Sequence, residues 1–190
     1  MRQLSKDRVV RLTKKIMRSK ILARLKTQKE EDRNRKSGII KKKLLRTLVF
    51  NKAKTVMFYL SFGGEVNTKG MIEQTYNLGK IVAVPWTKGN GAIRPSLLRK
   101  GMRLVRGPYG AKEPAAKEFI SLRNIDLVIV PGLAFDKKGN RLGRGKGCYD
   151  VFLKKLPKKA ASLGLAYDFQ ILPFVPATRE DKPVKRVLFA

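Results

Sequence analysis

Residues 143–150, Gly-Arg-Gly-Lys-Gly-Cys-Tyr-Asp, place three glycines, two cations and a carboxylate in one short loop. Glycines at alternate positions let backbone N–H groups converge on an anion, and Arg144 and Lys146 add positive charge. Asp150 follows in the first turn of a predicted helix. It could hold Mg²⁺ against a phosphate there, or it could stand there simply because the helix dipole favours a carboxylate. The pattern predicts a phosphate-binding loop; the alternative is a basic surface turn, because glycine-rich turns are common.

The segments on either side of this loop favour a phosphate site. Residues 125–130 form an apolar, β-branched run typical of a buried strand, from which the loop hangs. Residues 149–156 carry apolar side chains at helical spacing and end at Pro157. The loop is not a Walker A motif, since Asn140 stands where that motif needs glycine and Gly147 where it needs Ser or Thr.

The first predicted helix carries two apolar stripes, one of Val9, Leu12, Ile16 and Ala23 and one of Val10, Met17, Ile21 and Leu25. A dedicated basic arm would be poorer in apolar residues, so we predict a packed helix. At about 100° per residue, Lys14 and Arg18 fall within the second stripe and should point toward the protein body. Burying two cations is costly, so a bound polyphosphate or a buried carboxylate is expected there. The alternative is that both side chains extend past the stripe to water.

The elements that must position these residues alternate along the chain. We predict helices over residues 5–27, 29–52 and 68–78, and strands over residues 55–60, 81–84, 125–130, 162–166 and 184–189, with turn-rich sequence between the second and third strands. Such alternation predicts an α/β fold, a three-layer domain whose mostly parallel sheet has helices on both faces. With no repeat or linker, residues 1–190 are expected to form a single domain, with residues 1–12 as an N-terminal extension of the first helix.

Loops that follow three predicted strands should meet at one edge of this sheet. Residues 61–65 follow the first strand, Pro85 and Trp86 the second, and the glycine loop the third. In open α/β sheets, ligands bind beyond the carboxyl ends of the strands. We therefore expect one crevice that holds an aromatic ring or two, a carboxylate and the phosphate loop.

Composition limits the chemistry. Among 190 residues there is no His and only one Cys, Cys148. An intrachain disulfide and a thiolate zinc cluster are excluded, and a bound metal should be a hard ion on carboxylates, most plausibly Mg²⁺. No apolar run reaches the roughly 20 residues of a membrane span, and no secretory signal is visible, so we expect a cytoplasmic protein with no membrane partner.

The net charge of +30 first suggests nucleic-acid binding. Residues 1–54 hold 20 Lys and Arg against four acids, and residues 55–190 hold 24 against ten, so the excess is spread over the whole chain. A nucleic-acid-binding protein on an α/β scaffold is the competing interpretation, and it predicts binding that falls steeply with salt. A nonspecific nucleic-acid affinity is also expected as a side effect of charge in an enzyme.

Longer segments closely resemble a known family. Residues 130–136, Val-Pro-Gly-Leu-Ala-Phe-Asp, then residues 139–147 and the pair Tyr149-Asp150, resemble the signature of the 5-formyltetrahydrofolate cyclo-ligases, also called methenyltetrahydrofolate synthetases. Residues 14–18 are similar to the basic N-terminal helix of that family, and residues 59–66 to its first strand and folate loop. The middle segment, residues 107–110 with Glu113 and Pro114, is similar as well. Only the first dozen residues fall outside the resemblance.

The resemblance implies an ATP- and Mg²⁺-dependent closure of 5-formyltetrahydrofolate to 5,10-methenyltetrahydrofolate, with release of ADP and phosphate. A phosphorylated formyl group would be closed by attack of N10, with Arg144 and Lys146 stabilising the transferred phosphoryl group. By matching position, ATP contacts are implied for Lys14, Arg18, Arg141, Gly143, Arg144, Gly145, Lys146, Gly147, Cys148 and Tyr149; folate contacts for Leu60, Phe62, Glu65, Trp86, Tyr109 and Tyr149; and Mg²⁺ ligands for Asp150 and Asp181. The expected partner is a reduced folate, with or without a polyglutamate tail, bound by a monomer.

Cys148 departs from the family pattern, since most members carry Tyr there. An aromatic contact near the substrate is therefore missing, which puts Cys148 in doubt as a folate contact but leaves the phosphate chemistry intact. A further interpretation is an ATP-using ligase of the same fold that acts on another formamide or carboxylate. Substituting Glu65 would leave activity on the true substrate intact if that substrate lacks a pterin.

Overall fold

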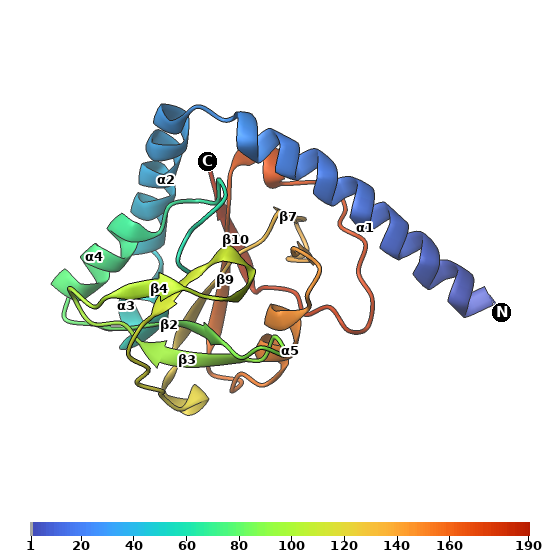
Figure 1. Cartoon of the computed structure of the whole chain (residues 1–190). Helices are drawn as coiled ribbons and strands as arrows, with labels where there is room; N and C mark the ends of the chain where they lie inside the picture. Colours follow the sequence, from blue (N-terminus) through green and yellow to red (C-terminus); the bar gives the residue numbers. More distant parts are fainter. Residues whose placement is uncertain (1) are drawn as a thin grey trace.

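The computed structural model describes the backbone of residues 2–190 and, within that range, all side chains except those of residues 2–5 and Tyr109. Its centre is a six-stranded sheet in the order β10-β9-β6-β1-β2-β3. These strands are β1 (Thr55–Met57), β2 (Ile81–Thr87), β3 (Ile93–Leu97), β6 (Leu127–Val130), β9 (Ala161–Ala166) and β10 (Arg186–Phe189). Every neighbouring pair is parallel except β2 and β3. The predicted α/β fold with a mostly parallel sheet is confirmed (Figure 1).

The helices are α1 (Arg2–Thr27), α2 (Glu30–Leu45), α3 (Leu48–Lys52), α4 (Lys69–Asn77) and α5 (Cys148–Lys154). The prediction of one helix over residues 29–52 is wrong, because the chain turns between α2 and α3. Thr47 has an extended backbone there, and its hydroxyl accepts a hydrogen bond from the Phe50 N–H. This is the geometry of a helix N-cap, so Thr47 starts a new helix rather than continuing the old one.

Alternate residues of the strands face two separate hydrophobic cores, one on each face of the sheet. In β6, Leu127 and Ile129 belong to the first core, and Val128 and Val130 to the second. Residues of α1, α2, α3 and α4 complete the first core, whereas Phe152 and other residues of α5 complete the second. A parallel strand buried on both faces is a continuous apolar run, which is why β6 was recognisable in the sequence.

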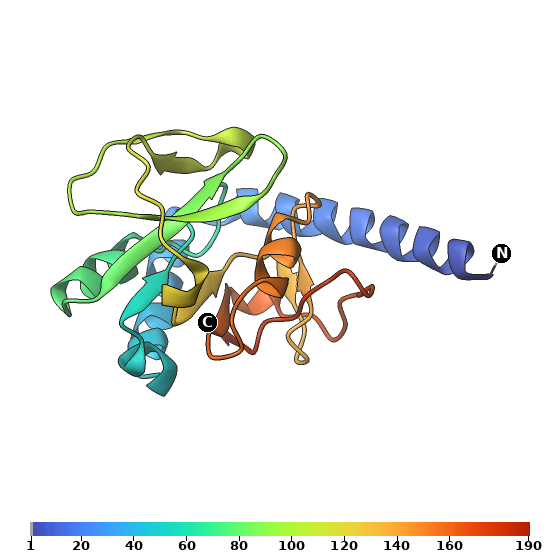
Figure 2. The ribbon, with the colours of Figure 1, turned by 90° about the horizontal axis from the view of Figure 1, so that it is seen from below.

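Five short strands lie in segments for which no strand was predicted. One is β3, and the others form two antiparallel hairpins: β4 (Leu104–Arg106) with β5 (Lys112–Pro114), and β7 (Ala134–Phe135) with β8 (Arg141–Leu142). Pro85 and Pro95 stand opposite each other in the β2–β3 pair. Proline donates no ladder hydrogen bond and is confined to sheet edges, so it concealed this edge strand. The β4–β5 hairpin packs beside β2 (Figure 2).

Helix α1 extends beyond the body on which it packs. Ile21 and Leu25 are buried, whereas Val9, Leu12 and Ile16 are 63%, 59% and 50% exposed. Figures 1 and 2 both show the N-terminal half of the helix leading away from the rest of the chain. The prediction of a packed helix is therefore correct for the second apolar stripe and wrong for the first, because a straight helix turns only one side to the core.

Asp136 organises the turn that joins β7 to β8. Its carboxylate accepts hydrogen bonds from the N–H groups of Lys138, Asn140 and Val175 and from the Asn140 amide. Burial opposes its ionisation, yet these hydrogen bonds hold the pKa of Asp136 below its ordinary value. A buried carboxylate thus fixes the turn. This turn then fixes the hairpin that leads to Arg141 and the glycine loop.

We expect Asp136→Ala to lower the free energy of unfolding by about 2–4 kcal/mol, because four donors lose their acceptor. Urea denaturation followed by circular dichroism measures this. Glu180→Ala, at an exposed carboxylate paired with Lys154, is the matched control and should change stability by about 0.5 kcal/mol or less.

The pH dependence of stability gives a second readout. Because its pKa is lowered in the folded state, ionised Asp136 stabilises the protein at pH values above its pKa in the unfolded chain. This contribution is lost as the pH falls through the folded-state pKa, so the difference between wild type and Asp136→Ala should shrink in acid. A constant difference would contradict the role given to the carboxylate.

Candidate active site

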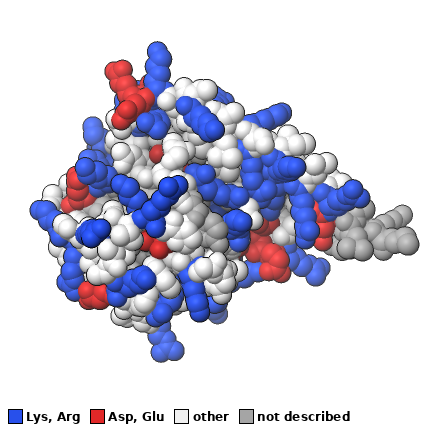
Figure 3. Space-filling view, viewed as in Figure 1, with Lys and Arg blue, Asp and Glu red and all other residues white. Residues whose placement is uncertain are grey.

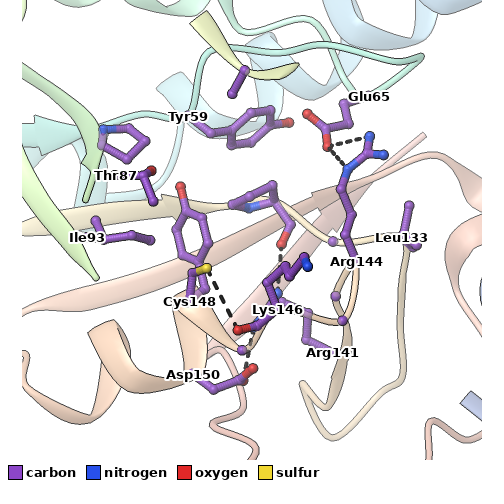
Figure 4. Close-up of a pocket in the computed structure, with 18 of the residues that line it drawn as sticks. Tyr59, Glu65, Thr87, Ile93, Leu133, Arg141, Arg144, Lys146, Cys148 and Asp150 are labelled. Carbon is purple, nitrogen blue, oxygen red and sulfur yellow. Dashed lines mark hydrogen bonds and ion pairs between the residues drawn. The ribbon is translucent and has the colours of Figure 1, made fainter. Parts of the chain in front are cut away.

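A cavity of about 260 Å³ lies beyond the carboxyl ends of β1, β2 and β6 (Figure 4). Leu60 and Glu65 reach it from the segment after β1, Thr87 from the end of β2, and Leu133 from the segment after β6. The charged residues that line it are Lys14, Arg18, Lys112, Arg141, Arg144 and Lys146, against Glu65, Asp150 and Asp181. The predicted crevice is present, and cations outnumber carboxylates in it two to one.

The glycine loop forms one wall of this cavity. It follows β8 rather than β6, because the β7–β8 hairpin lies between the buried strand and the loop. Gly145 and Gly147 have φ angles of 104° and 68°, in the left-handed region that favours glycine. Residues 144–147 are exposed, and α5 begins directly after them at Cys148. The glycines therefore set the path of an open loop whose two cations reach the cavity.

Lys14 and Arg18 connect α1 to the cavity, as their position in the second stripe predicted. Lys14 is only 8% exposed, and its ammonium lies 2.6 Å from the carboxylate of Asp181. The guanidinium of Arg18 donates a hydrogen bond of 2.9 Å to the carbonyl of Gly143 in the glycine loop. The expected compensating anion is therefore present as a carboxylate, and both cations line the cavity.

Asp181 is held in its ionised form. Burial opposes ionisation, but hydrogen bonds from Lys14 and from the N–H and hydroxyl of Thr178 keep the pKa of Asp181 below its ordinary value. Asp181 lies in residues 178–183, Thr-Arg-Glu-Asp-Lys-Pro, whose pattern alone is typical of a charged surface turn. The structure brings it to the cavity because Lys14 on α1 pairs with it across a large sequence distance.

Arg141 and Asp150 form a second pair, 2.9 Å apart, between β8 and α5. The side chain of Arg141 is 5% exposed, and its Nε has no hydrogen-bond acceptor among the described residues. The buried hydroxyl of Tyr149 is likewise without a partner in that part of the chain, and burial raises the pKa of Tyr149 far above its ordinary value. The Nε of Arg141 and the hydroxyl of Tyr149 are thus buried donors beside the cavity that have no acceptor among the described residues. An anionic ligand could supply one.

Glu65 and Arg144 form a third pair across the cavity, with a distance of 3.1 Å (Figure 4). Burial raises the pKa of Glu65 above its ordinary value, while Arg144 and the N–H of Phe62 act in the opposite direction. The guanidinium of Arg144 also lies 4.3 Å from the centre of the Phe62 ring. Arg144 therefore covers both the carboxylate and the aromatic face at this end of the cavity.

Asp150 and Asp181 are the carboxylates that could hold a metal. The N–H of Lys182, next in sequence to Asp181, donates to Asp150, so both carboxylates stand on the same side of the cavity. Among the described side chains, no group of three or more His, Cys, Asp or Glu forms a metal cluster. Two carboxylates suit a hard ion that takes its remaining ligands from phosphate oxygens and water, which is how Mg²⁺ is usually held.

Other expected site residues are placed unequally. Leu60, Phe62 and Cys148 line the cavity, and burial raises the pKa of the Cys148 thiol, which disfavours a nucleophilic thiolate. Trp86 does not line it: Pro85 and Thr87 do, and the Trp86 ring packs on Phe119 instead, 5.3 Å between centres. Tyr109, whose side chain lies outside the described part, cannot be placed.

The structure adds lining residues that sequence reasoning missed. These are Tyr59, Thr87, Ile93, Pro108, Ala111, Lys112, Pro131, Gly132 and Leu133. Side chains alternate along a strand, so Thr87 and Trp86 point to opposite faces of β2. Extending the predicted strand beyond Val84 would have placed Thr87 on the cavity side. Lys112 and its neighbours arrive on the β4–β5 hairpin, which had no recognisable strand pattern.

Comparison with known proteins identifies the family of this chain. Residues 10–190 match the 5-formyltetrahydrofolate cyclo-ligase family. The chain belongs to the 5-formyltetrahydrofolate cyclo-ligase family. It is 30% identical to the mouse 5-formyltetrahydrofolate cyclo-ligase over 192 residues, covering 95% of both chains. It is 33% identical to the Escherichia coli K12 cyclo-ligase over 141 residues, covering 72% of this chain and 78% of the relative.

A solved structure supports the same assignment. The 5,10-methenyltetrahydrofolate synthetase of Aquifex aeolicus is 32% identical, with a TM-score of 0.82, and the match covers 93% of this chain and 89% of that one. The resemblance found in residues 130–150 is therefore confirmed, and the chain is an enzyme of the cyclo-ligase family.

Positive charge is not confined to the cavity. On the face shown in Figure 3, Lys and Arg side chains are scattered over the body and along α1. None of the helices in the described range is long and apolar enough to cross a membrane. Charge by itself therefore does not distinguish a site on this protein, whereas the paired and buried charged groups set the cavity apart from the rest of the surface.

We expect inorganic tripolyphosphate to raise the melting temperature, since the cavity has excess cations and unpartnered donors. At about one hundred times its Kd, it should stabilise the fold by about 2.7 kcal/mol, a shift of about 5–10 °C. Lys14→Gln should weaken tripolyphosphate binding about tenfold, because a charge-assisted contact is lost. Lys20→Gln, at an exposed position on the same helix, is the control. Equal shifts in both variants would exclude Lys14 from the anion site.

Proposed function

We propose that the chain catalyses the ATP- and Mg²⁺-dependent conversion of 5-formyltetrahydrofolate to 5,10-methenyltetrahydrofolate, with release of ADP and phosphate. The observation that carries this proposal is the cavity itself, in a chain of the cyclo-ligase family: cations from α1, β8 and the glycine loop meet a buried carboxylate and an aromatic ring. The cations suit a triphosphate, and the carboxylate and ring suit a pterin.

The nucleotide phosphates would lie between α1 and the glycine loop. Lys14, Arg18, Arg141 and the loop residues 143–149 surround that end, and the unpartnered Nε of Arg141 supplies a ready donor. Polyphosphate oxygens would take over cations that are now paired with carboxylates. This exchange replaces one charge-assisted contact by another, so the desolvated cations keep an anionic partner throughout.

The pterin would lie at the Glu65 end. An ionised Glu65 can accept hydrogen bonds from pterin N–H groups, and the Phe62 ring offers a flat surface. Both are covered by Arg144 in the ligand-free protein. For the pterin to bind, the Arg144 guanidinium must leave Glu65, and the developing charge on the nearby phosphoryl group gives it a new partner.

The chemistry then needs positioning and charge more than side-chain covalency. The formyl oxygen attacks the γ-phosphorus, and the bond to ADP breaks. N10 next attacks the formyl carbon, loses its proton, and the carbon–oxygen bond breaks with phosphate as the leaving group. Arg144 and Lys146 on the glycine loop stabilise the transferred phosphoryl group, and the cavity wall holds the folate in line.

Asp150 and Asp181 are the residues we assign to Mg²⁺. When bound there, the ion would neutralise phosphate charge next to Lys14 and Arg141, the present partners of the two carboxylates. That the protein is a monomer located in the cytoplasm stays a prediction. The ATP contacts of Gly143, Gly145, Gly147, Cys148 and Tyr149 also stay predictions.

The proposal is tested by mixing the protein with 5-formyltetrahydrofolate, ATP and Mg²⁺ and following the absorbance of the methenyl product. Turnover should require all three and stop when EDTA removes the metal. No product under conditions in which the substrates are intact would refute the proposal. Steep inhibition by moderate salt, together with tight RNA binding, would favour the nucleic-acid interpretation.

Lys146→Ala should reduce kcat by about 10²–10³-fold, because one group that stabilises transition-state charge is lost. Folate binding, followed by fluorescence titration, should be retained, since Lys146 acts on the phosphoryl group. Lys159→Ala, at an exposed position that does not line the cavity, should keep full turnover. Normal kcat in Lys146→Ala would contradict the assigned role.

The raised pKa of Glu65 predicts that folate affinity decreases at acidic pH, which we call the acid limb of the binding profile. Since the carboxylate must be ionised to accept pterin N–H bonds, affinity should fall as the pH drops through this raised pKa. In Arg144→Ala the larger of the two influences that lower the pKa of Glu65 is gone, so the loss of affinity in acid should begin at higher pH. Glu65→Gln should bind folate weakly with no limb in this range. A limb that does not respond to either substitution would assign it to another group.

A further inference from the structure

The first apolar stripe of α1 points away from the protein body and has no role in the chemistry above. We call it the outer stripe; its members, all exposed, are Val9, Leu12, Ile16 and Ala23. Ile21 and Leu25, which anchor the helix in the core, lie on the opposite side. Figures 1 and 2 show the N-terminal half of α1 leading away from the rest of the chain, so the outer stripe is open to solvent.

The spacing of the outer stripe is that of a coiled-coil seam. Steps of three and four residues alternate along it, as between the a and d positions of a heptad repeat. The members of this repeat are Val9, Leu12, Ile16, Ser19 and Ala23. The hydroxyl of Ser19 donates to a carbonyl of its own helix at 3.3 Å, so this position needs no polar partner. At about 100° per residue, the apolar members span only about 60° of the helix circumference, less than the face of about 100° that packs on a globular core. The pattern therefore favours pairing with a single helix.

Positive charge borders the outer stripe on both sides. The heptad positions beside it, e and g, are occupied between residues 6 and 20 by Lys6, Arg8, Thr13, Lys15 and Lys20. The four cations are exposed, and within the described range none of them forms an ion pair with a carboxylate. Asp7, the only acid in the sequence of α1, falls on the opposite side of the helix. Residues at the e and g positions pair with charges of the partner helix, so they determine which partner fits.

This charge selects the class of partner. A second copy of the chain would bring the cations at e and g against cations. A nucleic acid would engage the cations and leave the apolar seam in water. A lipid surface is bound by a large apolar face that carries Trp, Phe or Leu, and the narrow outer stripe has only Leu12 of these. An acidic helix complements both the seam and its borders.

We propose that the outer stripe docks an acidic amphipathic helix of a partner protein, one that carries apolar residues at heptad spacing with Glu or Asp beside them. This inference does not depend on the proposed catalytic function. Lys14 and Arg18, which line the cavity, lie on the other side of α1, so the docked helix does not cover them. From Val9 to Ala23 the seam is about 21 Å long, which is short for a stable complex. The interface should therefore be transient, with a Kd of about 10–100 μM that rises with salt.

The probe is a fluorescein-labelled synthetic peptide of three heptads with Ile at a, Leu at d and Glu at e and g, compared with a scrambled peptide of the same composition. Fluorescence anisotropy should find the heptad peptide at least about tenfold tighter on the full-length protein. Leu12→Gln/Ile16→Gln keeps every charge and a good helix former at both positions, and should weaken this peptide about tenfold or more. Circular dichroism checks that the helix content is retained. The control Leu48→Gln/Leu78→Gln replaces exposed apolar residues outside α1 and should keep the wild-type affinity.

Other occupants of the outer stripe are outcomes of the same comparison. Equal affinity for the heptad and scrambled peptides, or an unchanged affinity in Leu12→Gln/Ile16→Gln, would show binding by charge alone and overturn the proposal. Vesicles of phosphatidylglycerol and a uridine 20-mer should bind the wild type and this variant equally, because the charge is the same. A selective loss of vesicle binding in the variant, with peptide binding retained, would assign the stripe to a lipid surface instead. A dimer found by analytical ultracentrifugation in the wild type and lost in the variant would assign the stripe to a second copy and overturn the proposal as well.

Discussion

Three ion pairs at one cavity constrain the rest of this structure, because each joins a carboxylate to a cation from another part of the fold. The pairs are Asp181 with Lys14, Asp150 with Arg141, and Glu65 with Arg144. They join α1, β8, α5, the glycine loop, the segment after β1 and the C-terminal loop, segments that no single hydrophobic contact unites. Breaking one pair would leave an uncompensated buried charge, which is far more costly than losing an exposed ion pair. The ion pairs that line the cavity therefore also hold separate segments of the fold together.

The same pairs explain how a site rich in charge can exist before its ligands arrive. Under the proposed function, an entering phosphate would take a cation from a carboxylate and a divalent ion would take the carboxylate in return, so each charged group would exchange one partner for another. Arg144 adds a steric element, since it covers Glu65 and the Phe62 ring together. Under the same proposal, nucleotide and folate would be coupled through Arg144, because the side chain that the phosphate attracts is the one that the pterin must displace.

The features that could be predicted from the sequence were those that a local pattern of residues determines. The apolar run of β6 and the helical spacing of Lys14 and Arg18 have few alternatives in packing, so both were placed correctly. Trp86 was misplaced because alternation along β2 sends it to the side away from Pro85 and Thr87, and β2 continues past its predicted end. The strands of the two hairpins are only two or three residues long and carry little apolar signal. The exposure of the first stripe of α1 depends on where the body of the protein ends.

Charge alone cannot choose a ligand on a protein with a net charge of +30, because lysine and arginine are scattered over its surface. An exposed ammonium in high dielectric attracts any anion weakly and is screened by salt within about 8–10 Å. Selectivity requires cations beside surface that excludes water, where the same charge acts over a lower dielectric. The cavity meets this condition through Lys14 and Arg141, which are both nearly buried. Anion contacts in the cavity should therefore persist at ionic strengths that screen the exposed lysines and arginines of the surface.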